Sequence, residues 1–117
     1  MATDVTTLEM EQGATFRVSL TYTDANNAPI SLVGYKAHMQ VRLRVGAPVL
    51  IDLSTENGGI VLNGTSGVIS VRGKASDTLK VTRNAVYDLH LISATDPEEV
   101  VRVFGGPVVL TKAVTVD

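Results

Sequence analysis

Apolar and polar side chains alternate strictly along two segments in the first half of the chain. In residues 15–23 the apolar positions are Phe16, Val18, Leu20 and Tyr22. In residues 36–44 the apolar positions are Ala37, Met39, Val41 and Leu43, and the polar positions are His38, Gln40, Arg42 and Arg44. A period of two places successive side chains on opposite faces of an extended chain. Both segments are therefore predicted to be β-strands with one buried and one wet face.

The other segments with strand character are short and are separated by turn signals. Asn, Asp, Gly and Pro gather at residues 24–29, 45–48, 56–59, 63–67 and 95–99, where they favour turn geometry. The further predicted strands are residues 5–10, 30–33, 49–54, 60–62, 68–72 and 84–93, and a last strand made of residues 100–104 and 107–116. Short strands at such regular spacing are typical of an all-β sandwich or barrel.

Two segments depart from this pattern. Alternation fails in residues 74–83, where Ser76 and Asp77 are suited to cap a single helical turn through Leu79, unless the segment is a loop across one end of the fold. A Gly-Gly-Pro sequence at residues 105–107 interrupts the last strand. Because such residues break a central ladder, we expect a bulge, a corner or an edge strand there.

These patterns predict an all-β fold, namely a single-domain antiparallel β-sandwich, immunoglobulin-like or related, with about seven to nine short strands. The 117 residues fit one domain, residues 1–117, that buries a core without metal or disulfide. Residues 2–10 and 112–117 are expected to be short terminal arms that reach neighbouring subunits, or else frayed ends. The valine-rich residues 108–116 indicate either a buried strand or an edge that meets another subunit.

Composition and charge argue against several classes of partner. The chain has 10 Lys and Arg against 12 Asp and Glu, scattered along its length, and a formal net charge of -2, so no nucleic-acid partner is expected. It has no cysteine, which fits assembly in a reducing cytoplasm. We expect no membrane partner, because there is neither a signal peptide nor an apolar run of spanning length. The few aromatic residues, with no Trp, offer little for stacking sugars.

No group of residues forms a recognisable catalytic site. His38 and His90 both occupy polar strand positions, and two imidazoles without a third ligand make a poor metal site. No nucleophile elbow is present to position a Ser-His-Asp arrangement. We therefore expect no enzyme, no cofactor and no small-molecule substrate.

Carboxylates are the remaining candidates for chemistry. Asp96, Glu98 and Glu99 share one loop that is suited to bind calcium weakly, although a solvated hairpin tip is the better interpretation because EF-hand spacing is absent. Asp52 and Asp88 stand at polar positions within strands. They are expected to pair with Lys or Arg across the sheet.

Five sequence groups occur in this order in a known kind of protein. They are EQGATF at residues 11–16, PISLVGY at 29–35, MQVR at 39–42, TENGGI at 55–60 and YDL at 87–89. Over nearly its whole length the chain resembles small β-sandwich virion structural proteins of tailed bacteriophages and prophages. Its strand layout is similar to that of the N-terminal domains of some baseplate and fibre-attachment proteins. Residues 80–83 depart from the resemblance, which implies a more helix-like, Ala-rich turn there.

The resemblance implies a non-enzymatic structural protein of the phage tail or head-to-tail region, such as a collar, connector, baseplate or fibre-attachment component. Its partners would be other phage structural proteins and copies of itself, and it would reside in the virion after assembly in the bacterial host cytoplasm. A capsid decoration (cement) protein is an alternative, and a host-surface glycan-binding module is a second one. The residues expected at subunit interfaces are Val5, Leu8, Met10, His38, Arg42, Arg44, Val114 and Val116.

Overall fold

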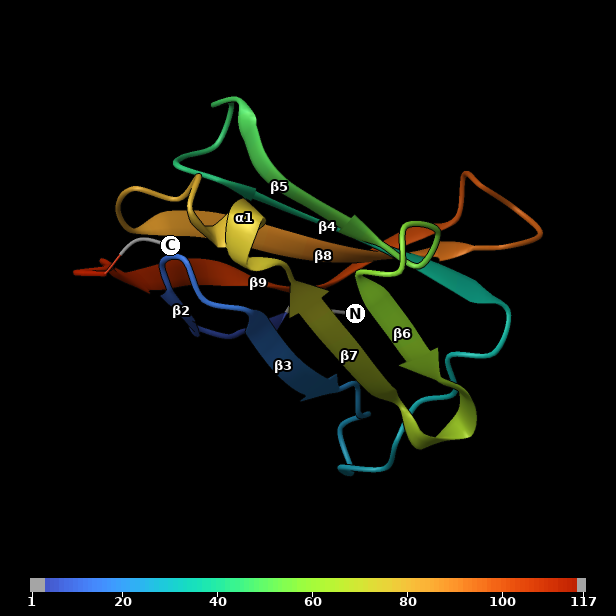
Figure 1. Ribbon diagram of the computed structural model, residues 1–117. Helices are drawn as coiled ribbons and strands as arrows, with labels where there is room; N and C mark the ends of the chain where they lie inside the picture. The colour runs from blue at the N-terminus through green and yellow to red at the C-terminus, as the bar shows by residue number, and fades with distance from the viewer. Residues whose placement is uncertain (1–3, 116–117) are drawn as a thin grey trace.

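The computed structural model of the protein describes residues 4–115, which fold into two β-sheets packed face to face (Figure 1). Nine strands lie in this range: β1 (Asp4–Val5), β2 (Leu8–Glu11), β3 (Phe16–Thr21), β4 (Tyr35–Arg42), β5 (Val49–Ser54), β6 (Ile60–Asn63), β7 (Val68–Gly73), β8 (Ala85–Ser93) and β9 (Val100–Thr111). Two short helical turns accompany them, η1 (Gly64–Ser66) and α1 (Ala75–Thr78). Neither turn is long or apolar enough to cross a membrane.

The two sheets differ in size, and the chain crosses between them several times. The larger sheet has the order β1–β9–β8–β4–β5, with β2 also paired to β9, and the smaller sheet has the order β3–β7–β6. The chain changes sheet after β2, β3, β5 and β7, which is the course of an immunoglobulin-like sandwich. The predicted all-β sandwich is confirmed. Two pairings differ from the antiparallel expectation, because β1 and β2 both run parallel to β9.

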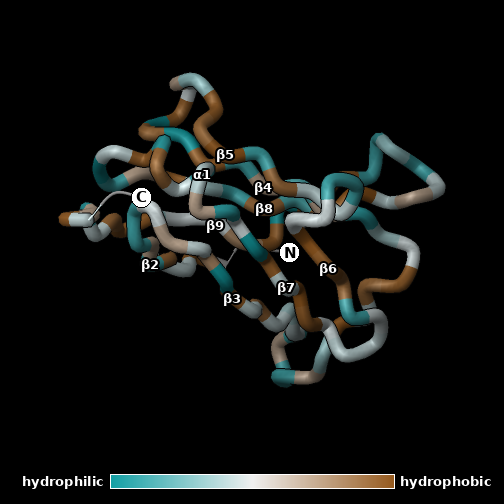
Figure 2. The backbone as a smooth tube through the Cα atoms, in the orientation of Figure 1, coloured by the Kyte–Doolittle hydropathy of each residue, from teal (hydrophilic) through white to brown (hydrophobic). Residues whose placement is uncertain are grey.

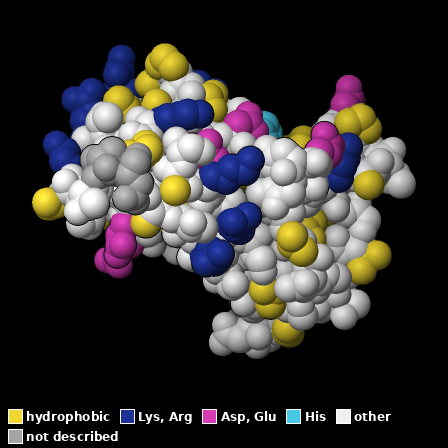
Figure 3. Space-filling model, in the orientation of Figure 1, with side chains coloured by type: hydrophobic (Ala, Val, Ile, Leu, Met, Phe, Trp, Pro, Cys, Tyr) yellow, Lys and Arg dark blue, Asp and Glu magenta, His cyan; other side chains and the backbone are white. Residues whose placement is uncertain are grey.

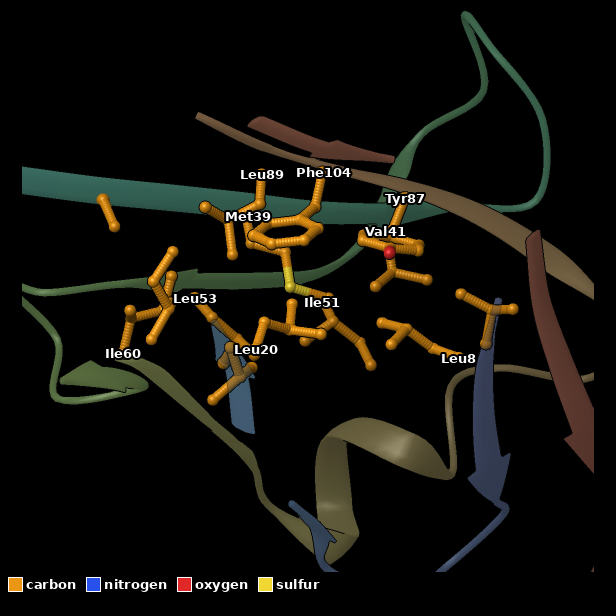
Figure 4. Packing of buried hydrophobic residues seen from close by; sticks show 14 of the residues in the cluster. Leu8, Leu20, Met39, Val41, Ile51, Leu53, Ile60, Tyr87, Leu89 and Phe104 are labelled. Atoms are coloured by element: carbon orange, nitrogen blue, oxygen red, sulfur yellow. The ribbon is translucent and has the colours of Figure 1, made fainter. Parts of the chain in front are cut away.

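The core lies between the sheets, on the faces that the alternation predicts. Along β4 and β8 every second side chain is buried, and Val41 and Leu89 have 0% of their surface exposed. Figure 4 shows Met39 of the larger sheet and Leu20 and Ile60 of the smaller sheet converging on the same space. Hydrophobic and hydrophilic positions alternate along the strands in Figure 2. The in-and-out assignment of β3 and β4 is therefore confirmed.

The interruption predicted at residues 105–107 is wrong. β9 runs unbroken through Gly105, Gly106 and Pro107, and the irregularity lies earlier, where the register with β8 shifts between Leu89 and His90. Pro107 is tolerated because β1 ends opposite Gly105 and β2 begins only opposite Val108, so residues 106 and 107 lack a strand partner on that side. Strand β9 itself ends at Thr111, short of the predicted end.

The N-terminal segment closes onto its own domain, so a free arm over residues 4–10 is wrong. Between β1 and β2, Thr6 donates its N–H to the carbonyl of Gly105 at 3.0 Å and accepts a hydrogen bond from the Tyr87 hydroxyl at 2.7 Å. This approach requires a glycine at position 106. A Cβ there would lie 2.9 Å from the Thr6 carbonyl oxygen, and the φ of 148° disfavours any side chain.

The predicted helical turn after β7 is confirmed as α1, but its cap is not the predicted one. Lys74 occupies the N-cap without a side-chain hydrogen bond, and Asp77 lies inside the turn. The residue that secures the turn is Thr78, which is completely buried. Its hydroxyl accepts the N–H of Gly13 at 3.0 Å and lies 2.9 Å from the carbonyl oxygen of Ala14. Thr78 thus ties α1 to the connection between β2 and β3.

Replacing Thr78 with valine should lower the free energy of unfolding by about 1–3 kcal/mol, because the Gly13 N–H would lose its partner in a partly buried place. Chemical denaturation measures the change. Thr78→Ser keeps the hydroxyl and should lose less than Thr78→Val, and exposed Thr82→Val should leave the stability unchanged. Equal stability of Thr78→Val and the wild type would show that this bond is unimportant.

Replacing Tyr87 with phenylalanine should change how stability depends on alkaline pH. Burial raises the pKa of the Tyr87 hydroxyl from 10.0 to about 12. The hydroxyl's contribution is therefore complete below pH 10 and is lost as the pH rises towards 12, because the unfolded chain ionises first. Melting temperatures between these pH values should fall more steeply for the wild type than for Tyr87→Phe. Parallel curves would contradict the assignment, and Tyr35→Phe serves as the control.

Candidate interaction surfaces

The polar positions of the larger sheet meet on its outer face, away from the core. His38 of β4 lies directly opposite His90 of β8, and Gln40 lies between Asp52 of β5 and Asp88 of β8. These positions belong to three neighbouring strands, so the period of two collects them on one face. The expectation that both histidines occupy polar strand positions is confirmed.

The first histidine belongs to a small hydrogen-bonded cluster. His38 Nε2 lies 2.8 Å from Asp52 Oδ1, and Gln40 Nε2 donates to Asp52 Oδ2 at 3.0 Å. Partial burial by itself would raise the pKa of the Asp52 carboxyl, but the hydrogen bonds from Gln40 and His38 and the charge of His38 outweigh it and lower that pKa. The expected Lys or Arg partner of Asp52 is therefore wrong, because a neutral amide and an imidazole take that place.

The second histidine has a looser partner. His90 Nε2 lies 3.5 Å from Asp88 Oδ2, and Arg102 Nη1 lies 3.9 Å from the same oxygen. Arg102 comes from β9, so the expected pairing of Asp88 with a basic residue across the sheet is confirmed. All three side chains are partly exposed, and such pairs typically contribute less than about 1 kcal/mol to stability.

Within the described residues, neither a serine partner for His38 nor a metal-binding group is found on the outer face. Ser54 lies opposite His38 in the strand register, but its hydroxyl accepts the N–H of Asn57 at 3.1 Å rather than contacting the imidazole. No set of three or more His, Asp or Glu side chains suited to hold a metal ion occurs in residues 4–115. The arrangement supports hydrogen bonding and charge recognition.

An open groove of about 820 Å³ runs beside this polar cluster on the same face. We call it the outer groove, and its lining residues include Val5, Arg42, Val45, Val86, Asp88 and Pro107. The apolar side chains share the groove with polar and charged ones, among them Gln40, His90 and Arg102 of the same sheet face. Two of its valines are almost completely exposed, Val45 at 91% and Val5 at 82%.

Arg42 fixes the turn that carries Val45. Its Nη1 donates to the carbonyl of Ala47 at 2.6 Å, and its Nη2 donates to Gln40 Oε1 at 3.0 Å. The turn is closed further by the N–H of Ala47, which donates to the carbonyl of Arg44 at 3.1 Å, and Gly46 supplies the positive φ of 85°. Val45 is therefore held out in the solvent by an ordered turn.

The predicted interface residues separate into three groups. Val5 and Arg42 line the outer groove, His38 lies on the same sheet face, and exposed Arg44 belongs to the adjoining turn. Leu8 and Met10 are buried in the core of their own chain, because β2 pairs with β9, so naming them as interface residues is corrected. Val114 is fully exposed after β9, and Val116 lies outside the described residues.

A second polar surface lies on the outer face of the smaller sheet, and the sequence did not reveal it. Arg17 of β3 stands directly opposite Arg72 of β7, and Ser19 stands opposite Ser70. A shallow hollow of about 390 Å³ adjoins these residues. Figure 3 views this side and shows Lys and Arg side chains gathered over β3 and β7. The strand register is what brings the two arginines together.

No protein-family model and no curated protein matches this chain. The resemblance to phage virion proteins therefore stays a prediction from the five sequence groups. The surfaces described above are the basis for the proposals that follow.

Replacing Gln40 with alanine should raise the pKa of the Asp52 carboxyl, because one of the hydrogen bonds that stabilise its charged form is lost. Carboxyl-carbon NMR titration measures the midpoint in the folded protein. In the wild type, the stability that Asp52 contributes is present above its ordinary pKa of 3.8 and is lost as the pH falls through the lower folded-state value. Ser19→Ala, on the other sheet, should leave the midpoint unchanged. An unchanged midpoint in Gln40→Ala would contradict the role of Gln40.

Proposed function

We propose that this chain is a non-enzymatic structural protein of a bacteriophage particle, in the tail or head-to-tail region, that acts through contacts with other subunits. The observation that best supports action through subunit contacts is the outer groove, where an ordered turn presents Val45 to solvent. The phage context rests on the sequence resemblance. The groove supports the contact function, because its features are those of a protein-binding surface.

The energetics of the groove favour a protein partner. Burying a valine side chain typically contributes about 1.5–3 kcal/mol relative to leaving it in water. A partner that covers Val5 and Val45 would therefore gain binding free energy from them. Apolar and charged side chains line the groove together, as they do in many non-obligate protein interfaces. Because Arg42 already orders the turn, binding of a partner does not incur the entropic cost of ordering it.

The aromatic residues give no support to the glycan-binding alternative. Phe16, Phe104, Tyr22 and Tyr87 are buried, and Tyr35 is only half-exposed, so the described residues present no open aromatic platform for a sugar. Replacing Tyr22 or Tyr87 would disturb the core, and loss of binding in such variants would not locate a glycan site. The decoration alternative differs from the tail proposal in copy number, which the experiment below counts.

Val45→Asp should reduce incorporation of the protein into phage particles at least about tenfold, because a charge replaces an apolar contact in a buried interface. The assay expresses each variant together with the structural genes that flank its own gene, purifies the particles and counts copies by quantitative mass spectrometry. A small multiple of three or six copies per particle is expected for a tail or connector ring. Hundreds of copies would instead indicate a decoration protein.

Val33→Asp is the matched control, because Val33 is also an exposed valine in a loop but does not line the outer groove. It should be incorporated like the wild type. Absence of the wild-type protein from particles would contradict the proposed function. Equal incorporation of Val45→Asp and Val33→Asp would contradict the assignment of the outer groove as the contact surface.

A further inference from the structure

We propose that the acidic loop between β8 and β9 of one copy docks on the Arg17–Arg72 pair of a second copy, so that the chain assembles head to tail. The proposal rests on the proposed function, because it names one of the subunit contacts of the same structural protein. It concerns a surface on the opposite side of the sandwich from the outer groove. The docking proposal is based on two separate sites whose charged side chains lack partners of opposite charge among the described residues.

The first site is the arginine pair. Side chains directly opposite each other on antiparallel strands are close neighbours, and like charges in that position are destabilising. Within residues 4–115, Arg17 and Arg72 make no side-chain hydrogen bond or ion pair with an acidic residue. The fold thus holds two positive charges together that a carboxylate pair from outside would neutralise.

The surroundings of the arginine pair suit a protruding loop. The adjoining hollow of about 390 Å³ is lined by the paired Ser19 and Ser70 and by Gly58 and Gly59. The serines add hydroxyl groups beside the arginines, and exposed Val61 also lines the hollow. The guanidinium and hydroxyl groups together offer hydrogen-bond donors to the carboxylates of a loop tip.

The second site is the β8–β9 loop, which is acidic and ordered by local bonds. Asp96 Oδ1 accepts the N–H of Glu98 at 3.1 Å, and the N–H of Glu99 donates to the carbonyl of Asp96 at 3.0 Å. Asp96 in turn donates its N–H to Ser93 Oγ at 3.2 Å. In the part of the chain that the structure describes, the exposed carboxylates of Glu98 and Glu99 have no basic partner.

The two sites cannot be the same patch meeting itself. In Figure 1 the β8–β9 loop projects from one end of the elongated molecule, whereas the start of β3 and the end of β7, which carry the arginine pair, lie away from that loop. A contact between two different patches is heterologous, and its repetition produces a closed ring or an open chain of copies. Charge complementarity between the sites selects a second copy as the occupant. Other acidic partners and small anions become outcomes of the test.

The test compares charge-reversed variants of the purified protein by sedimentation velocity at several protein and salt concentrations. Wild type should self-associate, and the association should weaken as salt is raised. R17E/R72E and E98R/E99R should each associate at least about tenfold more weakly than wild type. An equimolar mixture of the two variants should associate again, as should the fourfold variant, because every contact then joins opposite charges.

Two controls protect the interpretation. R83E/K112E makes the same change of charge at exposed positions away from the sheet faces and should associate like wild type. R17E alone places a glutamate opposite Arg72, so it should melt at or above the wild-type temperature while still losing association. Loss of association in this variant therefore cannot be attributed to unfolding.

Several results would overturn the docking proposal. One is a wild type that stays monomeric at low salt and high concentration. Another is a mixture of the two double variants that does not associate. If R17E/R72E lost association but E98R/E99R did not, the arginines would bind an acidic group other than this loop. Because the test uses only purified protein, the docking proposal and the proposed function, which is tested on particles, can fail independently.

Discussion

The register between β4 and β8 is the constraint on which the rest of the structure depends. It places Met39 opposite Leu89 and Val41 opposite Tyr87 on the inner face, and Gln40 opposite Asp88 on the outer face. A slip of one residue would turn every one of these side chains to the other side of the sheet. The core and the polar cluster are thus two consequences of one pairing, and neither can change without the other.

The second determinant is the way the N-terminal segment closes the sheet on β9. Gly106 has no side chain, so the backbone at Thr6 can approach, and the Tyr87 hydroxyl binds the Thr6 carbonyl. This closure places Val5 beside Gly105, where it becomes a wall of the outer groove, and buries Leu8 and Met10 in the core. The outer groove is therefore shaped by how the N-terminal segment is held, as well as by the strands behind it.

Much of the fold could be predicted because local patterns determine it. Strict alternation identified β3 and β4 and their buried faces, and residues 49–54 were predicted with the bounds that β5 has. The errors came from features that depend on distant neighbours. The Gly-Gly-Pro sequence was interpreted as a break, because the gap between β1 and β2 that accommodates Pro107 cannot be recognised before the pairing is known. Likewise, the sequence does not reveal that Leu8 and Met10 are buried in the core of their own chain rather than at a subunit interface.

The surfaces were harder to predict than the core. The cluster around Asp52 and the Arg17–Arg72 pair each join residues from different strands, and the register alone brings them together.

We propose that another subunit covers the outer groove in the assembled particle. A reconstruction of the assembled particle by electron cryomicroscopy tests it most directly. We predict density from a neighbouring subunit packed against Val45 and Val5. A map in which this protein is present but its outer groove faces open solvent would contradict the account.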